Sequence, residues 1–177
     1  TDRAVEIVSE VDGLRRLLLN QASLIYCLSL SRHDHELFEP GAPLFGDGVE
    51  AKFPALMSED ISEAGKCLAL NRWNAAVFHL MRVMEIALQK LGDVLNVSLV
   101  NEKQWQNILD EVNREIRKLD HKLPRTIALA EISFHLYAVK LAWRNEVMHP
   151  KQTYTHEEAD AIFRNVRIFI RELAGVI

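Results

Sequence analysis

The chain has 177 residues, of which 49% are hydrophobic and 26% charged, values ordinary for one globular domain. Its net charge of -4 excludes a generally basic nucleic-acid-binding protein, although local basic patches remain able to bind phosphate. Only 7 Gly and 5 Pro are present, which favours long helices over the frequent turns of an all-β fold.

Residues 4 to 30 carry apolar residues at helical spacing, so we expect one long helix or two short ones there. The run LLLNQASLIYCLSL is interrupted by polar residues and falls short of the roughly 20 apolar residues that a membrane span requires. We recognise no signal peptide and expect a cytoplasmic protein without membrane attachment. The first residue is Thr1, not Met, which suggests a fragment of a longer chain.

Cys27 and Cys67 lack the C-x-x-C spacing of metal and redox sites, so we interpret both as reduced packing residues. The stretch His33-Asp34-His35-Glu36 resembles a metal cluster in composition only. Residues two apart do not share a helix face, and no second ligand group has a supporting spacing. We therefore expect neither a metal nor a cofactor.

The segment RHDHELFEPGAPLFGDG contains Pro40-Gly41 and Gly46-Asp47-Gly48, which predict a loop and the main internal boundary. We expect an N-terminal helical segment with its Pro/Gly loop over residues 1–45. A helical bundle is expected over residues 58–177, and we expect the two parts to form one compact domain.

From Ser58 onward the sequence predicts further helices with short connections. One runs from about Asn74 to Leu91 with a stop at Gly92, one covers roughly 102–119, and one follows Pro124. The last begins at Thr155, which forms a capping-box pattern with Glu158. The expected fold is an all-α bundle of five to six helices with an additional N-terminal helical segment.

The helix expected over residues 74–91 is apolar on most sides, except for a polar stripe that includes His79, Arg82 and Glu85. Charged groups in a buried helix need partners or water. One interpretation is an Arg82–Glu85 pair beside a hydrogen-bonded core histidine. The other is that the three side chains line a water-filled cleft as accessory residues of a site.

The next polar stripe follows Pro124. Its members advance by four, three, four, three and four residues: Glu131, His135, Ala138, Ala142, Asn145 and His149. The two alanines leave room beside the polar groups for a ligand or a close partner helix. Alternatively the helix packs tightly at the alanines and the polar residues are solvated.

The stretch AWRNEVMHP ends this helix with Arg144, Asn145 and His149. Pro150 disfavours helical geometry at the residue before it, so we expect His149 at the helix end, turned toward Arg144. An imidazole that titrates near neutrality beside a guanidinium suits phosphoryl chemistry. His149 would move a proton, Arg144 would neutralise phosphate oxygens, and Asn145 would orient either group.

Three segments of the chain together resemble the HEPN superfamily, in particular bacterial members of abortive-infection and toxin systems. They are AVFHLMRVMEIALQKLG, AVKLAWRNEVMHP and YTHEEADAIFRNVRIFI. The resemblance covers about residues 58–177 and implies a helical bundle. It also implies a homodimeric, metal-independent endoribonuclease that acts as a toxin or antiviral defence effector and is restrained by an antitoxin or another regulatory protein.

Carried over residue by residue, the resemblance implies that Arg144, Asn145 and His149 form the catalytic motif. An RNA 2′-hydroxyl would attack the adjacent phosphate and leave a 2′,3′-cyclic phosphate and a 5′-hydroxyl. Family members that a partner nucleotidyltransferase modifies carry a tyrosine two residues after the histidine. Here that position is Lys151, with Tyr154 farther on, so the chain departs from the family pattern at the modified position.

An RNA substrate also needs backbone contacts, for which we single out a basic cluster near residue 120: Arg114, Arg117, Lys118, Lys122 and Arg125. Such charges also occur on ordinary solvated helix faces. Trp73, Trp105 and Trp143 are interpreted as core or interface anchors rather than stacking platforms for bases. The alternative to an enzyme is a non-catalytic HEPN-like dimer that binds nucleotide, RNA or a protein partner.

Overall fold

The computed structural model describes residues 2–24, 28–97, 105–139 and 153–177, and these residues form helices and no strand. The predicted all-α bundle is therefore confirmed. The chain divides into two units, Thr1–Leu30 and Ser31–Ile177. The division lies after Leu30, whereas the sequence placed the main boundary in the Pro/Gly loop that ends near residue 45. Each unit is described by itself.

The first unit consists mainly of helix α1 (Asp2–Ser23). All of its described side chains are exposed to solvent. Among them are apolar side chains at least half exposed, such as Val11, Leu14 and Leu18. Within this unit, the apolar face of α1 is therefore exposed.

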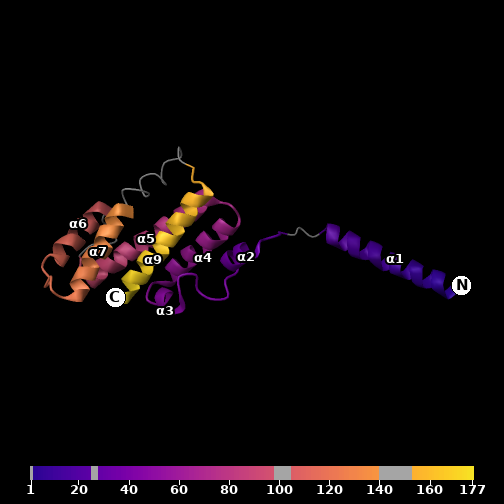
Figure 1. Ribbon diagram of the computed structural model, residues 1–177, viewed down its shortest axis with the longest axis horizontal. Coiled ribbons are helices and arrows are strands. Elements are labelled where there is room, and N and C mark those ends of the chain that lie inside the picture. Colours follow the sequence, from indigo (N-terminus) through magenta and orange to yellow (C-terminus); the bar gives the residue numbers. More distant parts are fainter. Residues whose placement is uncertain (1, 25–27, 98–104, 140–152) are drawn as a thin grey trace. The chain divides into compact units, whose positions relative to one another are not determined.

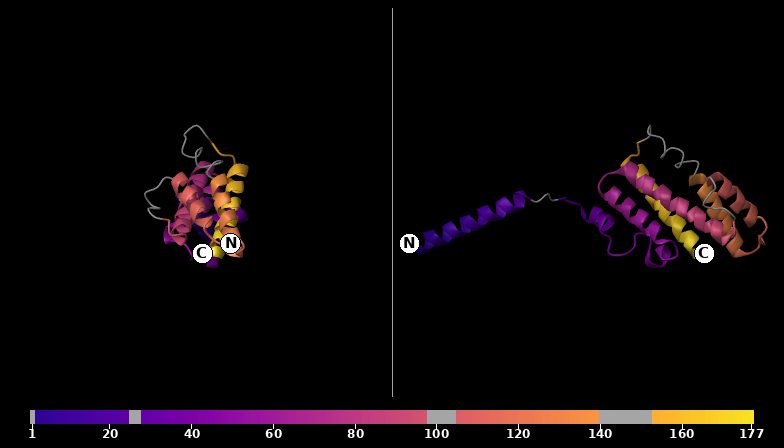
Figure 2. Two further views of the ribbon diagram at one scale, coloured as in Figure 1. Left: turned by 90° about the vertical axis from the view of Figure 1, so that its left-hand side faces the viewer. Right: turned by 180° about the vertical axis from the view of Figure 1, so that it is seen from behind.

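The second unit is a helical bundle built around α5 (Figures 1 and 2). Its helices are α2 (Arg32–Phe38), α3 (Asp47–Glu50), α4 (Ala55–Ala69), α5 (Trp73–Val94), α6 (Trp105–Ile116), α7 (Pro124–Val139) and α9 (His156–Val176). Helix α5 packs against α4, α6 and α9, and α7 packs against α6 and α9. The α4 side of the bundle and the α6–α7 side are thus separated by α5.

Two helices supply most of the core, as their apolar patterns predict. Ten residues of α5 are buried, from Ala76 to Gly92, so this helix is covered on most sides. Gly92 does not end α5, which continues to Val94. Helix α9 begins with the predicted capping box: Thr155 Oγ1 accepts from the backbone of Glu158, whose side chain accepts from the backbone of Thr155. Its inner face is buried and consists of Ala159, Ile162, Phe163, Val166, Phe169, Ile170, Leu173 and Ala174.

The segment expected to be a loop between residues 32 and 48 contains two short helices and belongs to the bundle. Ser31 caps α2 by accepting from the backbone N–H of Asp34. Phe45 is fully buried against Phe163, and its backbone is held on both sides. Glu50 Oε1 accepts from Phe45 N at 2.9 Å, and Arg171 Nε donates to Phe45 O at 3.1 Å. These bonds dock an irregular segment that periodicity alone does not assign to the core.

No helix among the described residues is long and apolar enough to cross a membrane.

Candidate functional site

The three residues expected to form the catalytic motif, Arg144, Asn145 and His149, lie outside the described residues, as do Trp143 and Lys151. The structure does describe the helices that precede and follow them in sequence. Helix α7 is described up to Val139, and the chain is described again from Thr153, which leads into α9. The described candidate residues lie on α4, α5, α6 and α7 and at the start of α9.

A polar cluster joins α4 to α5. Asp60 of α4 is 4% exposed and accepts hydrogen bonds from two side chains of α5. Arg82 Nε lies 2.8 Å from Asp60 Oδ1 and 3.0 Å from Oδ2, and His79 Nδ1 lies 2.9 Å from Oδ1. A buried carboxylate is costly unless it is paired and hydrogen-bonded, and here both conditions are met.

This cluster distinguishes between the two interpretations of the polar stripe that includes His79, Arg82 and Glu85, which lies on α5. His79 and Arg82 are held together by Asp60, whereas Glu85 is exposed and outside the cluster. The hydrogen bond that Arg82 donates to Asp60, and then the charge of Asp60, raise the pKa of the Arg82 guanidinium. Arg82 remains 44% exposed and His79 26% exposed, so the outer edges of both side chains still meet solvent. Internal pairing therefore accounts for His79 and Arg82, although their partner is Asp60 and not Glu85.

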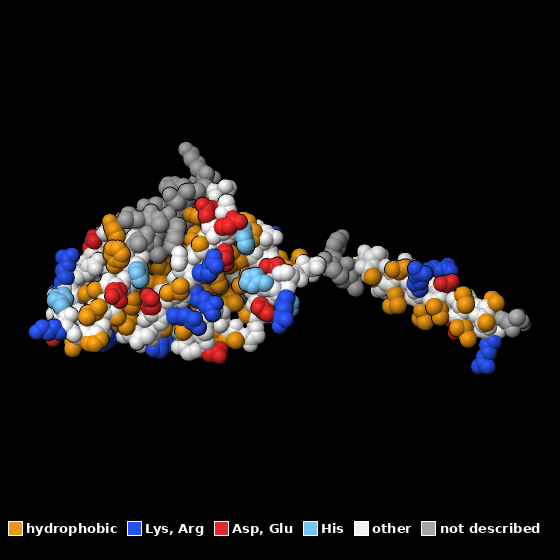
Figure 3. Space-filling model, in the orientation of Figure 1, with side chains coloured by type: hydrophobic (Ala, Val, Ile, Leu, Met, Phe, Trp, Pro, Cys, Tyr) orange, Lys and Arg blue, Asp and Glu red, His pale blue; other side chains and the backbone are white. Residues whose placement is uncertain are grey.

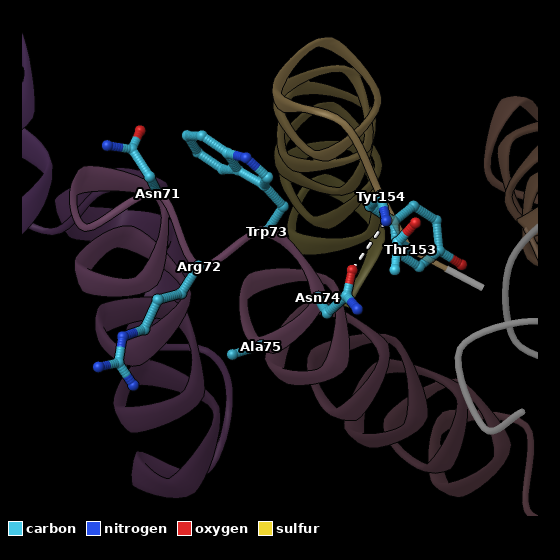
Figure 4. Close-up of a pocket in the computed structure, with 7 residues that line it drawn as sticks. All are labelled: Asn71, Arg72, Trp73, Asn74, Ala75, Thr153 and Tyr154. Carbon is cyan, nitrogen blue, oxygen red and sulfur yellow. Dashed lines mark hydrogen bonds between the residues drawn. The ribbon is translucent and has the colours of Figure 1, made fainter. Parts of the chain in front are cut away.

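An open hollow of ≈ 410 Å³ lies where α5 begins and the chain enters α9 (Figure 4). It is lined by Asn71, Arg72, Trp73, Asn74, Ala75, Thr153 and Tyr154. Asn74 Oδ1 accepts from the backbone N–H of Tyr154 at 2.8 Å, which ties the two segments together. The Trp73 ring packs edge-on against His156, with ring centroids 4.9 Å apart.

The turn between α4 and α5 positions the polar side chains of this hollow. Asn71 adopts a positive φ of 58°, a conformation that asparagine tolerates better than most residues. The backbone N–H of Arg72 then donates to Cys67 O at 2.8 Å and satisfies a carbonyl at the end of α4. The tight turn leaves Asn71, Arg72 and Asn74 exposed at the rim. In Figure 4 the side chains of Asn71 and Arg72 point to different sides and Asn74 points toward Tyr154, so Arg72 is the group of this set suited to a phosphate.

The five basic residues predicted to contact RNA are all exposed, and they lie on and between α6 and α7. Two of them are partly neutralised by acidic residues of α6. Lys118 Nζ lies 2.8 Å from Glu115, and Arg114 lies 3.6 Å from Glu111. Within the described residues, no ion pair involves Arg117, Lys122 or Arg125. These three charges are the ones available to an anionic ligand.

The accessory residues and the basic residues do not lie on one surface made by neighbouring helices. His79 and Arg82 face α4, whereas the basic residues belong to α6 and α7, and α5 separates the two sides (Figure 2). The structure therefore brings His79 and Arg82 together through Asp60, and groups the basic residues separately.

The polar residues predicted along α7 have different surroundings. Ser133 is fully buried and donates to Asn113 Oδ1 of α6 at 3.0 Å. Glu131 and His135 are exposed, and His135 Nδ1 lies 3.5 Å from Glu172 of α9. The remaining members of that stripe lie outside the residues whose side chains are described. Solvated polar groups therefore account for the described part of the stripe.

Helix α7 also exposes large apolar side chains. Ile127 is 50% exposed, Phe134 68% and Tyr137 40%. Together with Leu123, which is 53% exposed just before the helix, they follow a spacing of four, seven and three residues along one face. Exposed hydrophobic side chains are visible over the α6–α7 side in Figure 3. A contiguous apolar face of this kind is typical of a protein–protein contact.

Among the described residues, no group of three or more His, Cys, Asp or Glu side chains is placed to bind a metal. The residues from His33 to Glu36 instead belong to α2, where Arg32 pairs with Glu36 at 3.4 Å. Cys67 is a free, partly buried thiol whose pKa is raised by burial and then by the charge of Glu63. Cys27 lies outside the described residues.

Sequence reasoning missed Asp60, Arg72 and Asn74. Asp60 occupies an inward position of α4 next to Ile61, and a carboxylate among buried positions signals a basic partner. That signal was present in the stretch SEDISEAG. Arg72 and Asn74 gave no comparable signal, because the hollow depends on how close the start of α9 lies to the start of α5.

No model of a known protein family matches this chain, and neither curated proteins nor solved structures provide a match.

Proposed function

We propose that this protein is a HEPN-type, metal-independent endoribonuclease that acts as a homodimeric toxin or phage-defence effector. The observation that carries the proposal is the sequence Arg144-Asn145-Glu-Val-Met-His149, which lies between α7 and α9 in chain order. It combines a permanent cation with a group that titrates near neutrality, the two functions that phosphoester cleavage by an internal nucleophile requires.

In the proposed reaction the ribose 2′-oxygen attacks the adjacent phosphorus. A bond forms between the 2′-oxygen and phosphorus, and the bond from phosphorus to the 5′-oxygen breaks. His149 takes the proton of the 2′-hydroxyl, and the leaving 5′-oxygen receives a proton from water. The products are a 2′,3′-cyclic phosphate and a 5′-hydroxyl. Arg144 stabilises the extra negative charge on the phosphate, and Asn145 orients the reacting groups.

The hollow at the start of α5 supports a phosphate-binding role for this end of the bundle. His149 precedes Thr153 of the hollow by four residues, and four residues of chain span about 14 Å at most. The exposed guanidinium of Arg72 is a suitable partner for a neighbouring phosphate of the RNA. The proposal assigns the RNA backbone beside the cleavage site to this hollow.

The homodimer in this proposal is supported by the exposed apolar face of α7, formed by Leu123, Ile127, Phe134 and Tyr137. We assign the contact between two copies to this face, because α7 leads directly into the proposed motif. Phe134→Glu is then expected to abolish this contact and lower RNA cleavage. Ile168→Glu on α9, where Ile168 is 56% exposed, is the matched control and is expected to leave both unchanged.

The test is cleavage of a mixed pool of structured and single-stranded RNA in EDTA by wild type, Arg144→Ala and His149→Ala. The matched controls replace exposed residues of the same kind elsewhere: Arg164→Ala on α9 and His33→Ala on α2. We expect cleavage by wild type and both controls and its loss in both motif variants. Cleavage that survives both motif substitutions would overturn the assignment.

The second candidate function is a non-catalytic module that binds nucleotide, RNA or a protein partner. The pairing of His79 and Arg82 with Asp60 favours it, because this pairing gives two of the proposed accessory residues a structural role. This candidate predicts RNA binding by a folded protein without cleavage under any of the conditions above.

A further inference from the structure

The apolar face of α1 follows a seven-residue repeat. Ala4, Ile7, Val11, Leu14 and Leu18 advance by three, four, three and four residues, the spacing of positions a and d in a coiled coil. Gln21 takes the next d position. The outward positions b, c and f are mostly polar or glycine: Asp2, Glu6, Ser9, Asp12, Gly13, Arg16, Asn20 and Ser23, with Val5 and Leu19 as the exceptions.

Helix α1 has 22 residues and buries none of its described side chains. Ile7, Val11, Leu14 and Leu18 are between 54% and 71% exposed. Figure 3 shows exposed hydrophobic side chains along this helix. Isolated helices are marginal in water, and most helical stability in proteins comes from packing an apolar face. A helix with this pattern therefore needs a partner that covers its a and d positions.

The charges beside the a and d positions, which form the seam of a coiled coil, identify the partner. Glu10 occupies a g position and Arg15 the e position of the next heptad, five residues later. In a parallel, in-register pair of helices, the g residue of one helix lies beside that e residue of the other. Two copies would therefore form two symmetric Glu10–Arg15 pairs. Neither side chain has an ion-pair partner among the described residues, so both are available.

We propose that α1 forms a parallel two-stranded coiled coil with α1 of a second copy of this chain. The central heptad, with Val11 at a and Leu14 at d, is of the type that favours two strands, whereas Leu18 at a and Ile7 at d favour more; we assign two strands on the central heptad. Gln21 adds a polar pair to the seam, which helps to set the register. This association is independent of the proposed ribonuclease activity and uses a different surface from the α7 face.

The test is disulfide cross-linking in the full chain, with Cys27 and Cys67 replaced by Ser. Leu14→Cys places the two introduced thiols side by side in the seam, whereas Ser9→Cys at an outer f position places them apart. We expect a covalent dimer with Leu14→Cys to form at least about tenfold faster than with Ser9→Cys. Equal rates for the two variants would overturn the proposal.

Charge reversal in the Leu14→Cys protein tests the orientation. Glu10→Arg places an arginine of each helix beside Arg15 of the other, so like charges meet on both sides of the pair. We expect cross-linking to slow severalfold and not more, because each exposed ion pair contributes little. Adding Arg15→Glu restores opposite charges and is expected to restore the rate. Arg16→Glu, at an outer position, is the matched control and is expected to have no effect.

Failure of the double variant to recover would contradict the parallel, in-register pairing. The cross-link reports on the α1 contact alone, because the thiol at position 14 lies within α1 and not on the α7 face. Repeating it with Phe134→Glu removes the α7 contact, and we expect the cross-linking rate to stay the same. Absence of RNA cleavage by a protein without the Phe134 substitution, together with normal cross-linking at position 14, would overturn the proposed function alone.

Discussion

The guanidinium of Arg82 donates to both carboxylate oxygens of Asp60, with Nε 2.8 Å from Oδ1 and 3.0 Å from Oδ2. The two side chains differ in exposure: 6% for Asp60 and 44% for Arg82. An unpaired arginine at this position can still be hydrated, whereas an unpaired aspartate cannot. Removal of the two partners should therefore have unequal effects.

We expect Arg82→Met to lower the free energy of unfolding, because it leaves a buried carboxylate with His79 as its remaining side-chain partner. Asp60→Asn should cost less, about 1 kcal/mol, because the neutral amide is cheaper to bury. Arg164→Met removes an exposed pair with Asp160 and should change stability by less than about 0.5 kcal/mol. Urea unfolding measures all three. A smaller loss for Arg82→Met than for Asp60→Asn would contradict this explanation.

The docking of α2 against α4 depends on Gly65. A Cβ atom there would lie 2.7 Å from the backbone oxygen of Leu37 and 2.6 Å from a methyl group of Leu44. We expect Gly65→Ala to lower the free energy of unfolding by about 1–3 kcal/mol, because backbone would have to move. Gly175→Ala in α9 meets open space and is expected to be neutral or slightly stabilising. Similar urea midpoints for the two variants would show that α2 is not packed as described.

The capping box of α9 should contribute to stability. Thr155→Ala removes the acceptor for the backbone N–H of Glu158 and is expected to cost about 1 kcal/mol. Thr153→Ala, two residues earlier and exposed, is the control and should be nearly neutral. Thermal unfolding of both variants would distinguish them, and an unchanged midpoint for Thr155→Ala would contradict the cap.

The pKa of Glu157 is lowered by its own backbone N–H and then by the Thr155 hydroxyl. A lowered pKa in the folded state means stabilisation above the unfolded value, about 4.3, that is lost as the pH falls through the folded value. Glu157→Gln should therefore reduce stability at about pH 7 and have less effect at about pH 3. Urea unfolding at both values checks this, and an equal effect at both would contradict it.

Strong periodicity and side-chain capping made α5 and α9 predictable. Thr155 with Glu158 marks the start of α9 by a local bonding pattern, and the apolar residues that follow form one inward face. The approximate extent of α5 was also predictable, but Gly92 was an unreliable stop, because it is buried and α5 continues past it. A glycine ends a helix only when the following chain turns away there.

The irregular segment before α4 was not predictable from periodicity. Phe45 enters the core through bonds to Glu50 and Arg171, the latter 126 residues away in sequence. The Asp60 cluster likewise depends on the facing of α4 and α5, and the hollow on the approach of Tyr154 to Asn74. Each is a tertiary contact between segments whose own patterns do not specify the partner. The proposed motif at Arg144 and His149 rests on sequence alone.

The most direct test of the central claim is to identify the ends of any RNA fragments that the purified protein produces in EDTA. The account predicts 2′,3′-cyclic phosphate and 5′-hydroxyl ends, and no cleavage of a substrate with a 2′-deoxyribose at the mapped site. Fragments with 5′-phosphate ends, or no cleavage by a folded dimer, would contradict it.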